Sequence, residues 1–174
     1  MKSFVALLFV ALLAACSSPD VSRYAANQPV FDPAQFFLGK TDAWGMFQKR
    51  GGEVVKRFHV EITGSNSDGK LILDERFRYD DGTTQQRVWT LVRQADGSWR
   101  GTAGDVVGDA VGEAAGNALN WRYTLLLPVD GKTYEMKMDD WMYQMDDRTM
   151  INRTAMSKFG FEVGQVTLFF RKRD

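Results

Sequence analysis

The feature that most constrains this chain is a period-two alternation of apolar and polar residues, interrupted by short turn dipeptides. Four Asp-Gly pairs, at residues 68–69, 81–82, 96–97 and 130–131, are typical of β-hairpin turns. The pattern between them predicts strands near residues 44–49, 53–63, 70–79, 83–94, 98–103, 119–128, 132–143, 149–157 and 162–171. Eight or nine strands joined by short turns predict a mainly all-β fold, either an antiparallel up-and-down β-barrel or a strongly curled sheet.

One segment departs from this alternation. Residues 104–119 read GDVV-GDAV-GEAA-GNAL, a four-residue repeat that on a helix would align its glycines along one side. We expect a glycine-striped helix at about 104–118, although each glycine costs a helix about 1 kcal/mol relative to alanine. Close packing of the glycine side against a sheet would offset that cost. The helix would either cross the surface between two parts of the sheet or close one mouth of the barrel.

The first 15 residues have the order of a secretion signal: a positive charge at Lys2, an unbroken apolar run at residues 4–15, and small residues before Cys16. The run is too short to span a bilayer as a helix, which takes about 20 residues. Residues 13–16 (LAAC) resemble the lipobox of bacterial lipoproteins, in which the cysteine is acylated, for example with palmitate, and becomes the first residue. The alternative is an ordinary signal peptide followed by a chance cysteine.

The residues after Cys16 bear on location. In lipoproteins of this type, an aspartate at that position tends to retain the protein in the inner membrane. Ser17 and Ser18 stand there instead, so the resemblance implies a lipid anchor in the cell outer membrane, with the domain facing the periplasm. Residues 16–35 would form the lipidated N-terminus and a flexible tether, since this stretch is polar and proline-rich. Residues 36–174 would form the β-barrel-like domain.

Composition excludes several classes of function. The removed segment contains one charged residue, so the mature chain has 21 basic and 22 acidic residues, which gives no reason to expect a nucleic-acid partner. The single cysteine, Cys16, leaves no thiol for disulfides once it is acylated. The single histidine, His59, falls on the polar face of its strand and is expected at the surface. We therefore expect no metal site and no cofactor.

Charged residues also occur on the apolar faces of the predicted strands, which is unusual. Lys56 shares such a face with Phe58, and Glu75 shares one with Leu73. If Phe58 pairs with Leu73 across the hairpin, Lys56 lies opposite Glu75. A three-residue loop in the next hairpin would place Arg87 opposite Glu75 as well. The sequence thus predicts a row of inward charges across three strands.

A second inward charge is predicted in the C-terminal half. A two-residue turn at 130–131 places Trp121 opposite Asp140, and a further turn at 146–147 places Asp140 opposite Arg153. Buried charges are costly unless they are paired. Together with the row above, these residues are either a structural ion-pair network or a polar anchor for a ligand head group inside an otherwise apolar cavity. Acid–base catalysis by one of the carboxylates is a third option.

Six short stretches carry a likeness to a known family. They are residues 44–47 (WGMF), 73–77 (LDERF), 79–82 (YDDG), 120–123 (NWRY), 139–143 (DDWMY) and 156–160 (MSKFG). Through them the domain resembles the uncharacterised bacterial lipoprotein family called domain of unknown function 3833. This resemblance implies no established activity and hence no catalytic residue.

A weaker, architectural likeness is to lipocalin-type barrels, whose first strand begins with Gly-x-Trp. Here four residues separate Gly39 from Trp44. The likeness therefore concerns the lipocalin-like architecture, and it implies a cavity for an apolar ligand only by analogy.

Three classes of function follow. The first is a membrane-anchored periplasmic lipoprotein that binds or carries a lipid or other amphipathic ligand, with Met136, Met138 and Met142 on its apolar inner face. The alternative is a non-enzymatic envelope structural or assembly lipoprotein that acts through a protein partner, for which the outward Trp141 and Tyr143 are candidates. An enzyme is least favoured, because the chain offers one outward histidine and no free cysteine.

Overall fold

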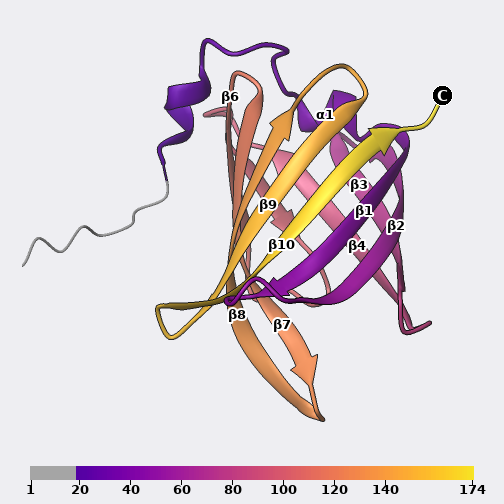
Figure 1. Cartoon of the computed structure of the whole chain (residues 1–174). Helices are drawn as coiled ribbons and strands as arrows, with labels where there is room; N and C mark the ends of the chain where they lie inside the picture. Colours follow the sequence, from indigo (N-terminus) through magenta and orange to yellow (C-terminus); the bar gives the residue numbers. More distant parts are fainter. Residues whose placement is uncertain (1–18) are drawn as a thin grey trace, which may run out of the picture.

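The chain folds into a closed barrel of ten antiparallel strands (Figure 1). The computed structural model describes residues 19–174. Each strand pairs with the next along the sequence, and the last pairs with the first. The strands are β1 (Gly39–Lys49), β2 (Val54–Ser67), β3 (Lys70–Tyr79), β4 (Thr84–Arg93), β5 (Trp99–Thr102), β6 (Ala110–Ala115), β7 (Ala118–Val129), β8 (Lys132–Gln144), β9 (Thr149–Lys158) and β10 (Phe161–Lys172). The predicted all-β, up-and-down barrel is confirmed, with ten strands instead of eight or nine.

The predicted helix at 104–118 is wrong, because this stretch forms a loop, strand β6 and a turn. The glycines that suggested one helix face have separate roles. Gly108, in the loop before β6, and Gly116, in the turn after it, have positive φ angles of 64° and 53°. Gly112 faces the ring of Trp121, where an added Cβ would lie 2.4 Å from the indole. The spacing of these three glycines therefore reflects a loop, a close contact and a turn, not helical periodicity.

Two hairpins have the predicted register. In the β3–β4 hairpin, Glu75 pairs with Arg87 across the expected three-residue loop. In the β7–β8 hairpin, Trp121 pairs with Asp140 across a two-residue turn at 130–131, where both residues have positive φ angles. Because the turn fixes the register of a hairpin, correct placement of these turns also placed the facing side chains correctly.

The β2–β3 hairpin differs from the prediction. Strand β2 continues as far as the Asp-Gly turn, so Phe58 pairs with Tyr79 instead of Leu73. The offset is an even number of residues, and the same side chains therefore face inward. Lys56, however, does not lie opposite Glu75, and the predicted row across three strands is reduced to a pair.

The β8–β9 hairpin is offset by one residue. Its loop has three residues instead of two, because the Asp146 carboxylate accepts hydrogen bonds from the two backbone N–H groups that end it. Asp140 consequently pairs with Thr154, and Arg153 points outward. A shift of one residue moves every side chain to the other face, so the predicted pairing of Asp140 with Arg153 is wrong and Asn152 takes an inward position.

An aromatic segment fills one end of the barrel. Helix α1 (Pro33–Phe36) lies there, at the upper end in Figure 1. The flanking Phe31, Phe36 and Phe37 are 3%, 3% and 4% exposed. Their rings pack edge to face on one another and on Phe170 of β10. We call this the closed end of the barrel.

The described part of the expected tether, residues 19–35, packs on the barrel. The 3-10 helix η1 (Val21–Tyr24) brings the Tyr24 ring to 5.7 Å from Trp141 and 5.3 Å from Tyr143, measured between ring centroids. Both aromatics point outward as predicted, but Trp141 is buried. The N-terminal segment thus covers the surface that we expected to be free for a partner.

The predicted signal peptide (1–15) and lipidation site (Cys16) lie outside the described residues. Within residues 19–174, no helix is both long and apolar enough to cross a membrane. Export, acylation and membrane anchoring remain predictions from the sequence.

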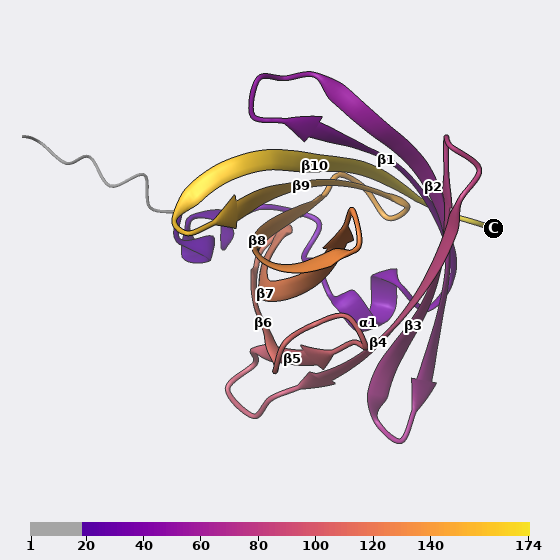
Figure 2. The ribbon, with the colours of Figure 1, turned by 90° about the horizontal axis from the view of Figure 1, so that it is seen from below.

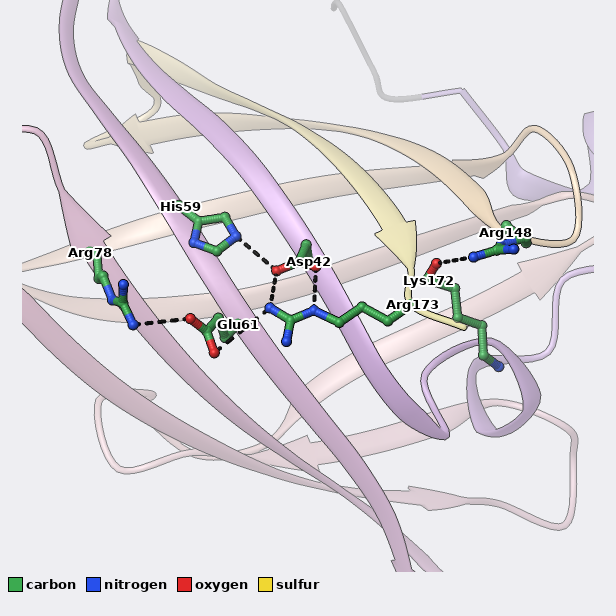
Figure 3. A network of polar contacts seen from close by, with 7 residues as sticks. All are labelled: Asp42, His59, Glu61, Arg78, Arg148, Lys172 and Arg173. Carbon is green, nitrogen blue, oxygen red and sulfur yellow. Dashed lines mark hydrogen bonds and ion pairs between the residues drawn. The ribbon is translucent and has the colours of Figure 1, made fainter.

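A polar network on the outer surface ties the C-terminus to the first two strands (Figure 3). Arg173, which follows β10, pairs with Asp42 of β1 and lies 3.8 Å from Glu61 of β2. The hydrogen bond from Arg173 lowers the pKa of Asp42. His59 Nε2 lies 2.9 Å from Asp42, and Arg78 of β3 contacts Glu61 at 3.1 Å. His59 therefore lies on the outer surface of the barrel, as its position in the strand pattern predicts.

Candidate functional site

The barrel contains a cavity of about 570 Å³. Its lining extends from Phe37 in the closed end to Thr83 and Pro128 beside the turns at the opposite end. Both of the latter residues are exposed, so the cavity reaches solvent there. Figure 2 shows the barrel from this side, which we call the open end.

Most of the cavity wall is apolar. Phe58, Trp89 and Trp121 contribute large rings, and the two indoles pack edge to face with centroids 5.6 Å apart. Met138 and Met142, two of the three methionines predicted on the inner face, also line the cavity. Such a wall suits the hydrocarbon or aromatic part of a ligand.

A group of charged side chains interrupts this wall. Nη1 of Arg87 lies 3.7 Å from Oε2 of Glu75. The same guanidinium donates hydrogen bonds to Asp105 through Nε at 2.9 Å and Nη2 at 2.8 Å. Burial raises the pKa of Glu75 to about 7, and the charge of Arg87 opposes this shift only in part. We call Glu75, Arg87 and Asp105 the charged cluster.

Asp140 is a further acid on the cavity wall, 7% exposed. Its carboxylate accepts a hydrogen bond from Nδ2 of Asn152, which also donates to the carbonyl of Trp141 at 3.1 Å. Burial raises the pKa of Asp140 to about 7. Within residues 19–174 it has no ion-pair partner; Arg87 lies near enough to favour the charged form, but it pairs with the cluster acids.

The structure brings together three of the five predicted head-group residues. Glu75 and Arg87 pair as predicted, and Asp140 lies in the same cavity. Lys56 is near the open end, where it pairs with an aspartate of the β3–β4 loop at 3.1 Å instead of Glu75. Arg153 does not belong to the site, because it points outward and donates a hydrogen bond to a glutamine of β10.

Sequence reasoning missed several polar residues of this site. Asp105 was assigned to the predicted helix, whereas it lies in the loop between β5 and β6. Asn152 and Thr154 alternate between two buried methionines of β9, a period-two signal that the wrong register concealed. Tyr123 also lines the cavity, and burial raises the pKa of its hydroxyl, with the charge of Asp140 adding to the effect.

The site is chemically an apolar chamber with one polar side. An apolar group would contact the aromatic wall, and a polar head would meet the charged cluster and Asp140. Within the part of the chain that the structure describes, no group of three or more His, Cys, Asp or Glu side chains is arranged to hold a metal ion.

Fold and cavity together define a closed up-and-down β-barrel, an antiparallel meander of ten strands around an internal chamber. Residues 10–172 match the family model described as "Protein of unknown function (DUF3833)", and the chain belongs to this family. The family inferred from the six sequence stretches is thus confirmed. Comparison with curated proteins gives no match.

The solved structures that resemble the barrel include the following two. The S-type phycobiliprotein lyase CPES from Guillardia theta has a TM-score of 0.59 at 6% identity, covering 90% of this chain and 98% of the lyase chain. A redesigned β-barrel, mFAP0, bound to DFHBI, has a TM-score of 0.41 at 11% identity, covering 79% of this chain and 100% of that one. The likeness to the lyase shows a shared fold and nothing about activity.

Proposed function

We propose that this chain is a membrane-anchored periplasmic lipoprotein whose barrel binds or carries a lipid or another amphipathic ligand. The observation that carries the proposal is the open-ended cavity of about 570 Å³, with its apolar wall and buried charges. Ligand sites are typically mostly apolar, measure about 300–1,000 Å³ and contain a few polar groups that fix orientation. Protein interiors are otherwise close-packed, so a chamber of this size is a feature that folding alone does not explain.

The polarity of the chamber suggests how a ligand lies in it. The closed end is aromatic around Phe37, whereas Asp105 lies in a loop at the open end. An apolar tail would therefore point toward the closed end, and the head group would lie at the charged cluster. Nothing in this arrangement requires a chemical step, and we propose binding without catalysis.

Ligand occupancy is testable by native mass spectrometry of protein purified from cell envelopes. We expect a co-purifying amphipathic molecule on the unmodified chain and its reduced occupancy on Met138→Trp, which places a large ring in the chamber. Lys137→Trp is the matched control, since it adds the same ring to the exposed face of β8. Repeated absence of any bound molecule from the unmodified protein would contradict the proposal.

The anchor requires a separate test. Cys16→Ala, exported with an ordinary signal peptide, should lose palmitate labelling and leave the membrane fraction, because it lacks the acylated residue. Ser17→Asp keeps the cysteine and should move the protein toward the inner membrane on a sucrose gradient. Membrane association of Cys16→Ala that survives a salt wash would rule out a purely lipid tether.

One observation favours a second candidate, a structural or assembly lipoprotein that acts through a protein partner. Phe159 and Phe161, at the β9–β10 turn, are 88% and 70% exposed. Exposed apolar patches often mark interaction sites. The two phenylalanines of this turn are therefore better candidates for a partner contact than Trp141 and Tyr143, because Tyr24 covers those two residues. Crosslinking in cells with and without Phe159→Ser would test it, and an unchanged set of partners would exclude this surface.

A further inference from the structure

The cations that line the cavity are already neutralised. Arg87 places Nε and Nη2 on Asp105 and Nη1 beside Glu75. Lys56 lies 3.1 Å from the carboxylate of Asp81, with its Nζ 4.3 Å above the ring of Tyr79. An entering anionic head group would have to displace a carboxylate from one of these cations. The chamber thus offers no free positive charge within residues 19–174.

The acids that line the cavity exceed these cations. Glu75 shares Arg87 with Asp105, whose hydrogen bonds from the guanidinium are 2.8–3.0 Å long, whereas the Glu75 contact is 3.7 Å. Asp140 accepts a hydrogen bond from the neutral side chain of Asn152, and it lies near Arg87 without forming an ion pair with it. An isolated ionised carboxylate away from water is costly. A cation or a strong N–H donor inside the chamber would complement this excess of acids.

We infer that the chamber selects amphiphiles with a protonated amine head group, for which Glu75 and Asp140 act as counter-charges. This inference rests on the proposed function and names its ligand class. A protonated amine donates up to three hydrogen bonds and complements two acids at once. A fatty-acid carboxylate would add a further negative charge to a region already rich in acids. The raised pKa values of Glu75 and Asp140 agree with this, because an entering cation would stabilise their ionised forms.

Three ligands with the same tail and different heads test the inference: dodecylamine, dodecan-1-ol and dodecanoate. Each would compete with the neutral apolar dye N-phenyl-1-naphthylamine for the full chain at pH 7.5, below the micelle concentration of the amine and the carboxylate and below the solubility limit of the alcohol. We expect the amine to displace the dye at a concentration at least about tenfold below that of dodecanoate, the difference that one charged hydrogen bond provides. Dodecanol should fall between the two.

Variants identify the residues responsible. Asp140→Asn and Glu75→Gln should each reduce the preference for the amine over dodecanol by about tenfold. Glu135→Gln is the matched control, since it removes the same charge from the exposed face of β8 and should change nothing. The ligand series on the unmodified chain stands even if one variant fails to fold.

The outcomes separate this inference from the proposed function. If dye and dodecanol bind but dodecanoate binds as tightly as the amine, the chamber binds amphiphiles and the head-group assignment is wrong. The assignment also fails if the amine preference persists in both acid variants. If neither the dye nor dodecanol binds, the proposed function fails together with the inference.

Discussion

The two ends of the barrel differ in the exposure of the phenylalanine side chains that lie near them. At the closed end, Phe31, Phe36 and Phe37 lie in a connecting segment and are buried; at the open end, Phe159 and Phe161 flank a hairpin turn and are exposed. The difference is the path of the backbone, because the N-terminal segment turns in over the end of the barrel and the β9–β10 turn extends away from it (Figure 1). A loop aromatic can therefore complete the core or remain available for another molecule, and its identity alone does not tell which.

The largest expected effect is the loss of stability when a phenylalanine of the closed end is truncated. Phe37→Ala should lower the free energy of unfolding by about 3–5 kcal/mol, because it leaves a cavity among the packed aromatic rings of the closed end. Phe159→Ala, the same substitution at the open end, should change it by less than about 0.5 kcal/mol. Urea unfolding followed by tryptophan fluorescence measures both. Similar losses of unfolding free energy in the two variants would show that Phe37 and Phe159 contribute equally to the packing of the fold.

The next effect concerns the charges between the two ends. Arg87→Met should destabilise the barrel by about 2–3 kcal/mol, because it leaves the carboxylates of Glu75 and Asp105 without their cation in a largely buried site. Arg153→Met makes the same change on the outer face and should be nearly neutral. If both variants unfold at the same urea concentration as the unmodified protein, the charged cluster is more hydrated than its geometry indicates.

A pH-dependent effect should isolate Asp140. Its folded-state pKa of about 7 exceeds the ordinary value of 3.8, so the native state holds the proton more tightly than the unfolded chain. The contribution of this group is most favourable at low pH and is lost as pH rises through about 7. Asp140→Asn removes the titration and keeps an acceptor for Asn152. From pH 5 to pH 7.5, the unmodified protein should lose about 2 kcal/mol relative to the variant in paired urea titrations; a constant difference would mean that Asp140 titrates normally.

The smallest expected effect is a gain at the open end. Phe159 has a φ angle of 51°, a position occupied by Asp68 and Asp130 in the other two-residue turns. Bulky residues are disfavoured there, whereas aspartate is tolerated. Phe159→Asp should therefore stabilise the fold by up to about 1 kcal/mol, measured as a rise in the urea midpoint. A loss of stability would show that the phenylalanine packs within the fold instead of serving an external contact.

Local signals predicted much of this structure from the sequence. Period-two alternation located nine of the ten strands, and two turns set the registers that bring Glu75 to Arg87 and Trp121 to Asp140. These features depend on residues within one hairpin, where turn chemistry and side-chain alternation act directly. The sequence therefore predicted those strand positions and registers that depend on the residues of a single hairpin.

Features that depend on distant residues or on one loop position were not predictable in this way. Gly112 of β6 is explained by the indole of Trp121, a residue of the next strand. A single extra loop residue exchanged Arg153 for Asn152 on the inner face. The cavity itself depends on the separation of opposite walls, which alternation does not encode, since it gives only the direction in which each side chain points.

The packing of η1 against the closed end of the barrel constrains how the molecule would be oriented on a lipid bilayer. Tyr24 packs near the β6–β7 turn, at the closed end of the barrel. Residues 17–20 alone would separate a lipid on Cys16 from η1, and an extended chain spans only about 3.5 Å per residue. A lipid there would hold the closed end close to the bilayer and direct the open end away from it. Exchange of a bound molecule would then take place with a partner in the aqueous space, not with the membrane that carries the anchor.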